Sequence, residues 1–340
     1  MNSPKRLSRR HRTLIAFLAT GTILALALVL GICIGGQFTP PETVLAALQG
    51  QSDRSALAII WEIRIPRTLA AAVAGLGLGL AASLLQTLTR NPVADAGLLG
   101  SNAGATVVVA VGMATGAAGG FIAQSAFAFL GALIATAFVC AVGLSGRVHS
   151  VTRLVLLGVA LSAVLIGMTN GIMLAVPQAF EGMRHWLAGS TVGVPLSATT
   201  IGAITVLSAL LLAALVSRSL ELTRLGEDSA RALGARLGLT RTGTVVSVAL
   251  ASSAATALVG PVAFVGLIAA HAAARLSELA GLDAYARHSL SAIGGAILLL
   301  CADIIGRVAL WPGELPAGIV IAVIGAPALL WIVRKARSLT

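Results

Sequence analysis

The sequence predicts an all-α protein that crosses a membrane about ten times. Hydrophobic residues make up 57% of the 340-residue chain and charged residues only 10%, whereas soluble domains contain about 45–50% and about 25%. The charges are also clustered, so that long stretches carry none, and a membrane-spanning helix needs only about 20 apolar residues. Only helices and closed barrels satisfy the backbone within lipid, and long apolar runs without alternation indicate helices. The composition therefore excludes a soluble enzyme.

Glycine and proline divide the uncharged runs into expected helices. The run 96–146 is too long for one crossing and breaks at 114–120 (ATGAAGG), and the run from Thr242 breaks at Gly260–Pro261. Pro261 is expected in the first turn of the next helix, where proline is favoured. The first apolar run is too long for a cleaved signal and is interpreted as a span. The expected helices are roughly 14–35, 67–89, 97–114, 121–145, 153–176, 196–217, 242–259, 262–279, 288–306 and 315–333.

The basic residues predict the orientation of the chain. With these helices, 18 of the 23 Lys and Arg residues fall on one side of the membrane and five on the other, and the richer side is normally cytoplasmic. Both termini are then cytoplasmic, with a basic tail at 1–13, one transmembrane domain at 14–335, and a long cytoplasmic loop at about 218–241. Topology also explains the net charge of +11, and a nucleic-acid partner is not expected because the chain has one Tyr for stacking.

The sequence contains no motif typical of catalysis or cofactor binding. The two lysines, Lys5 and Lys335, follow no glycine-rich phosphate-binding loop. The five histidines have no metal-ligand spacing, and Cys33, Cys140 and Cys301 are interpreted as small buried side chains. We therefore expect no enzyme activity, no metal and no cofactor in this chain.

Glycines at helical spacing are expected to mark close helix packing. Two pairs have this spacing, Gly75–Gly79 and Gly116–Gly120. Small residues let helices approach closely within lipid, so both pairs are predicted to be packing seams.

Three arginines form a candidate site on the less basic, outer side. Arg64 and Arg67 flank Pro66, which fixes the backbone, and Arg307 closes the ninth expected helix on the same side. Their guanidinium groups are expected at the membrane surface, where contact with lipid headgroups is the alternative to a specific role. Asp303 lies one turn before Arg307 and is an equally good candidate for a local ion pair with it.

A second candidate lies in the cytoplasmic loop, at residues 225–234 (LGEDSARALG). Acidic residues in the first turn, Arg231 near the end and Gly234 just beyond are typical of a short helix. A helix of two turns is marginal without a partner surface. This segment is therefore predicted to dock on another protein, with a solvated loop as the alternative.

Four ordered motifs resemble the permeases of the FecCD-type ABC importers, which carry ferric siderophores, haem or cobalamin. The first runs from Arg64 to Ala105 and begins RIPRTLAAAVAGLGLGLAASLLQ. The others are LGEDSARALGARLG at 225–238, FVGLIAAHAAARL at 264–276 and ADIIGRVALWPGELPAGIVIAVIGAPALLW at 302–331. The resemblance covers about residue 40 to the C-terminus. It implies a type II ABC importer permease with ten spans in the cytoplasmic membrane of a bacterium.

The resemblance also implies partners and site residues. A second permease, identical or paralogous, two cytoplasmic ATPases that bind ATP and Mg²⁺, and an extracytoplasmic binding protein are expected. Arg64, Arg67 and Arg307 match positions that dock acidic residues of the binding protein. The segment that contacts the ATPase is matched by Gly226, Glu227, Arg231, Ala232, Leu233 and Gly234.

One departure and one alternative function remain. The family usually has Pro before the histidine of its third motif and Arg three residues after it, whereas this chain has Ala270 before His271 and Ala274 after it. No specific role for His271 is therefore predicted. The alternative function is a secondary transporter driven by an ion gradient, which would be expected to carry intramembrane carboxylates. In this sequence only Asp303, near the end of an expected helix, is a candidate for such a carboxylate.

Overall fold

A computed structural model describes residues 9–35, 39–144, 151–310 and 312–337. Within these ranges the chain contains helices and no strands, so the predicted all-α class is confirmed. The first eight residues of the expected basic tail and Arg147 in the expected cytoplasmic connection lie outside the described residues. Arg9 to Thr13, predicted as part of the tail, already belong to the first helix.

Every expected span coincides with a helix. In the part of the chain that the structure describes, seven helical segments are long and apolar enough to cross a membrane, and two more helices, α5 and α14, are apolar but shorter. α12 coincides with the remaining expected span and has 16 residues. The ten helices are α1 (Arg9–Cys33), α4 (Ile65–Thr89), α5 (Ser101–Ala114), α6 (Phe121–Leu144), α7 (Val151–Ala175), α9 (Leu196–Leu222), α11 (Leu237–Val259), α12 (Val265–Ala280), α13 (Ala284–Ala309) and α14 (Ala317–Arg337).

Short helices connect the long ones, and most were not expected. They carry charged residues and are too short for the apolar-run criterion, so hydropathy alone does not reveal them. They comprise α2 (Pro41–Leu48), α3 (Arg54–Ala58), the π-helix η1 (Ile59–Arg64), the 3₁₀ helices η2 (Ala96–Leu99) and η3 (Thr223–Leu225), α8 (Pro177–Leu187) and α10 (Glu227–Ala232).

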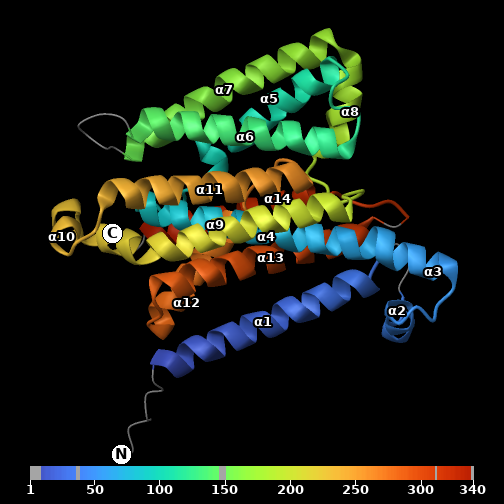
Figure 1. The fold of residues 1–340 in the computed structure, drawn as a ribbon, viewed down its shortest axis with the longest axis horizontal. Coiled ribbons are helices and arrows are strands. Elements are labelled where there is room, and N and C mark those ends of the chain that lie inside the picture. Colours follow the sequence, from blue (N-terminus) through green and yellow to red (C-terminus); the bar gives the residue numbers. More distant parts are fainter. Residues whose placement is uncertain (1–8, 36–38, 145–150, 311, 338–340) are drawn as a thin grey trace, which may run out of the picture.

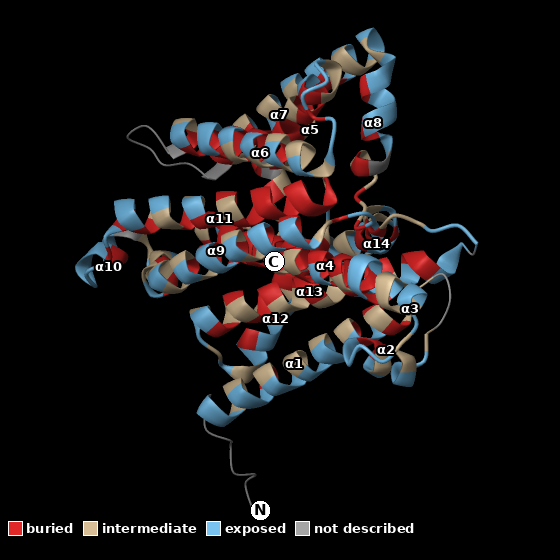
Figure 2. Cartoon of the chain, turned by 45° about the vertical axis from the view of Figure 1, so that its right-hand side comes forward, coloured by how far each residue is buried: buried red, intermediate tan, exposed pale blue. Residues whose placement is uncertain are grey.

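α4 forms the centre of the helix bundle. It packs against α9, α11, α12 and α13, while α5, α6 and α7 form a group at one side that joins the centre where α6 meets α11 (Figure 1). In the most apolar part of the segment that contains α4, 89% of residues are buried, against 17% for α1 and 11% for α7. Figure 2 shows the same contrast, with exposed residues along α1 and α7. These two helices therefore present apolar surface to lipid or to another subunit.

The connections separate into two ends of the bundle. The start of α1 and the whole of α10 lie toward the left of Figure 1, whereas α2, α3 and α8 lie toward the right. We refer to the end with α10 as the coupling end and to the end with α2, α3 and α8 as the outer end.

A glycine seam joins α4 to α13. A Cβ atom on Gly75 would overlap the backbone of Gly295, and one on Gly79 would overlap the backbone of Ser291. The predicted seam at Gly75–Gly79 is therefore confirmed. The predicted seam at Gly116–Gly120 is wrong, because both residues lie in a turn with nothing within 4 Å of an added Cβ, and Gly116 has a φ of 75°.

Replacing Gly79 by Ala is expected to lower the free energy of unfolding by about 1–3 kcal/mol, because the added methyl group would push α4 away from α13. Gly21→Ala in α1 is the matched control, since nothing lies within 4 Å of its added Cβ. The control is expected to leave stability unchanged or raise it by up to about 1 kcal/mol through helix propensity. Detergent-titration unfolding of both variants measures the difference, and equal effects would contradict the seam.

The connection after α11 corrects one expectation. Pro261 does not lie in the first turn of a helix, because α11 ends at Val259 and α12 begins only at Val265. Gly260 has a φ of 77°, and a Cβ atom added to it would overlap the carbonyl of Trp186, so the chain turns close to the end of α8 before the next helix starts. The break itself lies at Gly260–Pro261 as predicted.

Candidate functional site

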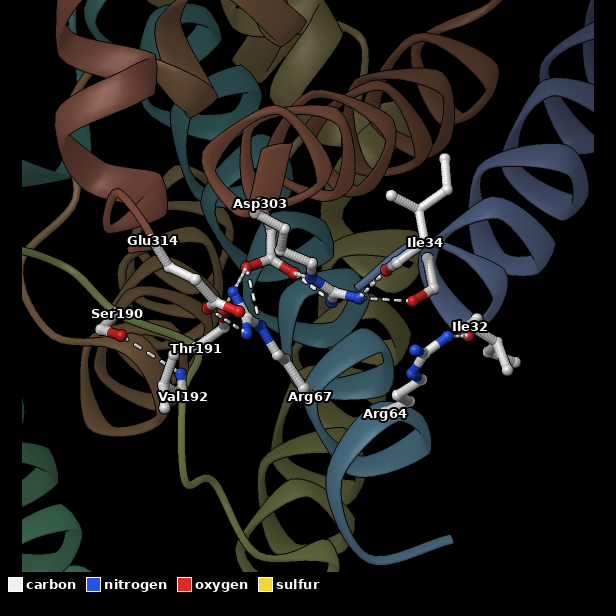
Figure 3. Close-up of polar contacts among 11 residues, drawn as sticks. Ile32, Ile34, Arg64, Arg67, Ser190, Thr191, Val192, Asp303 and Glu314 are labelled. Atoms are coloured by element: carbon white, nitrogen blue, oxygen red, sulfur yellow. Dashed lines mark hydrogen bonds and ion pairs between the residues drawn. The ribbon is translucent and has the colours of Figure 1, made fainter. Parts of the chain in front are cut away.

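A buried polar network lies at the outer end, around Asp303 of α13. Arg67 donates to Oδ1 of Asp303 from Nε at 3.1 Å and from Nη2 at 2.9 Å. Thr191, in the connection between α8 and α9, donates to the same oxygen at 2.6 Å. Arg67 also donates from Nη1 to Glu314 at 2.6 Å, as Figure 3 shows. One guanidinium group thus links α4 to α13 and to the α13–α14 connection.

Arg307 completes the network on the other side of Asp303. Its Nε donates to Oδ2 of Asp303 at 3.0 Å, and its Nη2 forms an ion pair with the same oxygen. Its Nη1 donates to the carbonyl of Ile34 at 2.8 Å and to that of Gly31. The predicted local pair between Asp303 and Arg307 is therefore confirmed, and the same arginine also holds the end of α1.

Arg64 binds the same helix end from η1. Its Nη1 donates to the carbonyls of Ile32 and Cys33, each at 2.8 Å. The last carbonyls of a helix lack partners within the helix and carry partial negative charge, so a guanidinium group there is favourable. Figure 3 shows Arg64 reaching Ile32 on the side of the network away from Glu314.

The three arginines do not lie at the surface as expected. The exposed fractions are 7% for Arg64, 8% for Arg67 and 2% for Arg307. A buried charge is costly unless it is paired and hydrogen-bonded, and carboxylates or helix-terminal carbonyls of this chain meet that requirement. The structure thus brings Arg67 and Arg307 together on one carboxylate, and their docking role stays a prediction.

Arg67 also lines a cavity of about 280 Å³ at the outer end. Gln124 of α6 and Trp186 of α8 line the same cavity, and the Nε2 of Gln124 and the Nε1 of Trp186 are buried without a hydrogen-bond partner among the described residues. Both atoms are donors. The wall of the cavity therefore contains N–H groups without a partner, together with a guanidinium group, and this composition suits an acceptor such as a carboxylate.

The predicted cytoplasmic helix exists as α10 and lies at the opposite end of the bundle. It ends as the sequence suggested, because Gly234 has a φ of 84°. The N–H of Gly234 donates to the carbonyl of Arg231 at 2.9 Å, and that of Ala235 to the carbonyl of Ala230 at 2.9 Å. These two bonds form a Schellman C-cap, and the buried side chains of Ala230 and Ala235 fix the helix against the start of α11.

The coupling end exposes apolar side chains around α10. Leu225 is 65% exposed and Leu233 is 59% exposed. Arg231 forms an exposed ion pair with Asp228 at 3.3 Å, which contributes little to stability. Of the remaining predicted coupling residues, Ala232 and Gly234 are exposed and Gly226 is half-buried, while the side chain of Glu227 lies outside the described set. In this chain Leu225 and Leu233 are therefore accessible to another protein.

The other expectations concern His271, the cysteines and metal binding. His271 is half-buried in α12 and makes contacts of its own. Cys33 and Cys140 are buried as expected, but Cys301 is exposed on α13, so the expectation of a buried side chain is wrong there. In the ranges that the structure describes, no group of three His, Cys, Asp or Glu side chains is arranged to hold a metal.

Comparisons with known proteins agree with this arrangement. The sequence profile of the FecCD transport family matches residues 23–335. The chain is 42% identical to the ferric enterobactin transport system permease protein FepD of Escherichia coli, over 92% of this chain and 93% of FepD. It is 35% identical to the Fe(3+) dicitrate transport system permease protein FecC of Escherichia coli, over 86% and 88%.

Two further proteins extend the comparison. The vitamin B12 import system permease protein BtuC of Salmonella paratyphi A is 33% identical over 96% of this chain and 97% of BtuC. Among solved structures, an inward-facing metal-chelate type ABC transporter matches with a TM-score of 0.80 at 24% identity, over 94% of this chain and 99% of that one. At this identity the structural match concerns the fold.

Proposed function

Because the chain belongs to the FecCD transport family of ABC importer permeases, we propose that it conducts a ferric siderophore across the cytoplasmic membrane. As a permease subunit it is a non-enzymatic pore component of an ATP-driven importer. Permeases of this family work with ATPase subunits and a binding protein. The orientation proposed here, with both termini in the cytoplasm, makes the coupling end cytoplasmic.

The cargo assignment is supported chiefly by the relation to FepD. The 42% identity to that ferric enterobactin permease exceeds the 33% identity to the vitamin B12 permease BtuC, and both alignments cover more than nine tenths of the chain. FecC is also a permease for a ferric chelate, of dicitrate. A ferric siderophore is therefore proposed ahead of cobalamin and haem.

In this proposal the two ends of the bundle contact different partner proteins. ATP and Mg²⁺ bind on two ATPase subunits, which contact α10, and a second permease, identical or paralogous, shares the pathway. The binding protein docks at the outer end. The spans move between outward-open and inward-open arrangements, and the cargo is not altered chemically.

Reconstitution tests this proposal. The chain is purified with its neighbouring subunits in proteoliposomes, and uptake of iron-55 ferric enterobactin, cobalamin and haem is measured with and without ATP. ATP-dependent uptake of the siderophore alone is expected. Uptake by the isolated chain under an ion gradient without ATP would instead support the secondary transporter. ATP-driven uptake of cobalamin alone would retain the importer and overturn the cargo.

Docking of the binding protein is proposed to use Arg64, Arg67 and Arg307, and the structure distinguishes their accessibility. Arg307 is 2% exposed and is bonded on all sides to Asp303 and to α1. Arg67 instead lines the outer cavity beside Gln124 and Trp186. A carboxylate of the partner that enters this cavity would compete with Glu314, whose side chain is 35% exposed. Arg67 is therefore the residue on which docking is expected to depend most.

Arg67→Gln is expected to weaken binding of the cognate binding protein by about tenfold to hundredfold, because a hydrogen bond to a charged group contributes about 1.5–3 kcal/mol. Surface plasmon resonance on the complex in nanodiscs at low salt measures the affinity. Arg184→Gln is the matched control, since Arg184 is exposed on α8 at the same end and the charge change is identical.

The control is expected to change the affinity by less than about threefold, as is usual for an exposed charge. Gln124→Leu provides a second variant that leaves the Asp303 network intact, and it is expected to weaken binding in the same direction. Equal affinities for wild type, Arg67→Gln and Gln124→Leu would rule out docking in this cavity.

A further inference from the structure

A second polar cavity, of about 470 Å³, lies at the coupling end. It is formed where α4 and α9 end, where α13 begins, and along the last turns of α12. Among the described residues none of α10 lines it, although Arg224 of η3, the short helix just before α10, does. It is also at the opposite end of the bundle from the Asp303 network.

The carboxylates at this cavity are already engaged. Glu221 accepts a hydrogen bond from Arg287 at 2.5 Å and another from Arg224 at 2.8 Å. Glu278 pairs with Arg275 at 3.3 Å. Among the residues that line the cavity, three guanidinium groups, those of Arg90, Arg224 and Arg287, stand against the two carboxylates. The charge around the cavity is therefore positive, and a cation would be repelled.

Hydrogen-bond donors, in contrast, remain unused. Gln86 and Ser277 line the cavity, and the Nε2 of Gln86 and the Oγ of Ser277 are buried without a partner among the residues that the structure describes. Ser277 is only 6% exposed. Arg90 lies one turn after Gln86 and donates to the backbone carbonyl of Thr223 through Nη2, and a guanidinium group has five N–H donors. Buried polar atoms normally have partners, so these donors indicate an absent acceptor.

We propose that this cavity binds the phosphate group of an anionic ligand. Phosphate offers several acceptor oxygens, and the planar fork of arginine matches its geometry. The volume falls within the range of about 300–1,000 Å³ that is usual for small-ligand sites. Basic pockets between helices on the cytoplasmic side of a membrane are known to receive the headgroups of anionic phospholipids. The phosphate belongs either to such a headgroup or to a free phosphate ion.

The assignment to a headgroup rests on the proposed orientation, whereas the phosphate chemistry does not. If the coupling end faced the other side of the membrane, the same donors would still select an anion. The inference is therefore distinguishable from the proposed transport function, because binding is measured without ATP, cargo or binding protein.

Native mass spectrometry of the complete importer complex tests the site. Nanodiscs of phosphatidylcholine alone and with phosphatidylglycerol are compared, and calorimetry with inorganic phosphate is run in the phosphatidylcholine nanodiscs. Wild type is expected to retain phosphatidylglycerol specifically. Ser277→Ala, Gln86→Leu and Arg90→Gln are each expected to reduce that retention by about fivefold or more. Arg10→Gln is the control, because Arg10 is an exposed arginine at the same end.

The outcomes separate the two sources of phosphate. Retention of phosphatidylglycerol that inorganic phosphate does not displace supports a lipid headgroup. Calorimetric binding of phosphate that is lost in the three variants supports a free ion.

Equal retention of phosphatidylglycerol in wild type, the three variants and the control, with no phosphate binding, would overturn the proposal and indicate that the cavity holds water. An anion that binds only after the ATPase is removed would also overturn it, in favour of an acidic segment of that partner. Ser277→Ala removes one hydroxyl group, and its melting temperature verifies that the variant folds.

Discussion

Replacing Asp303 by Asn is expected to lower the free energy of unfolding by about 3–5 kcal/mol, the usual cost of removing one partner from a buried ion pair. Asp303 is 1% exposed and accepts hydrogen bonds from Arg67, Arg307 and Thr191. Without its charge, two buried guanidinium groups would lie close together, with Glu314 as the one remaining carboxylate paired to either of them among the described residues. Unfolding in mixed detergent micelles, followed by circular dichroism, measures the loss.

Glu278→Gln is the matched control for Asp303→Asn. It removes the same charge from an ion pair, but Arg275 and Glu278 are 46% and 63% exposed, and exposed pairs contribute about 0–1 kcal/mol. The double variant Asp303→Asn, Arg307→Leu is expected to be more stable than the sum of its single changes predicts, since it removes one of the orphaned charges. Additive losses, or a loss in Asp303→Asn no larger than in the control, would contradict a network that holds α1, α4 and α13 together.

Replacing Leu233 by Asp is expected to abolish coupling between ATP hydrolysis and transport. Leu233 projects from the Schellman C-cap that ends α10 and is 59% exposed in the isolated chain. If it enters an apolar groove on the ATPase, a carboxylate there would be buried without a partner, and hot-spot residues of this kind contribute about 2 kcal/mol or more. ATP-driven uptake in proteoliposomes should fall about tenfold or more while basal hydrolysis by the ATPase continues.

Leu239→Asp is the control for Leu233→Asp. Leu239 is 67% exposed in the first turn of α11, six residues further along the chain, and undergoes the same chemical change. Because it lies outside α10, its effect on uptake is expected to be less than about twofold. Normal coupling in Leu233→Asp, or an equal loss in both variants, would count against α10 as the ATPase contact.

The long helices could be predicted from the sequence because the hydropathy of each uncharged run determines them. An uncharged run of about 20 residues has one stable form in lipid, and the breaks at 114–120 and Gly260–Pro261 follow from the local conformation of glycine and proline. The termination of α10 at Gly234 was predictable for the same reason, since the required backbone conformation is local.

The buried network was less predictable because it depends on tertiary contacts. The pair between Asp303 and Arg307 lies within one helix and was anticipated from its spacing. Arg67, Thr191 and Glu314 come from three other segments, and nothing in their spacing indicates that they meet. Arginines beside an apolar run were therefore expected at the lipid surface, whereas burial became favourable once carboxylates from distant segments were available. One sequence feature did point to an ion pair at this end, because the acidic Glu314 follows Arg307 by only seven residues.

Glycine spacing illustrates the same limit. Gly75–Gly79 and Gly116–Gly120 have the same separation, but only the first pair lies inside a helix that faces another helix. The spacing of two glycines predicts that a second helix could approach closely at that point. Whether a second helix lies there depends on the arrangement of the bundle.

The arrangement of the two ends across the membrane is tested most directly by cysteine accessibility. Ser229 in α10 and Pro312 beyond α13 are both exposed and lie at opposite ends of the structure. Each is replaced by Cys in a variant that lacks Cys33, Cys140 and Cys301, and intact cells are treated with a membrane-impermeant maleimide. Labelling at Pro312→Cys in intact cells, and at Ser229→Cys only after lysis, is the expected result. Labelling of both positions from the same side would contradict the separation of an outer docking end from a cytoplasmic coupling end.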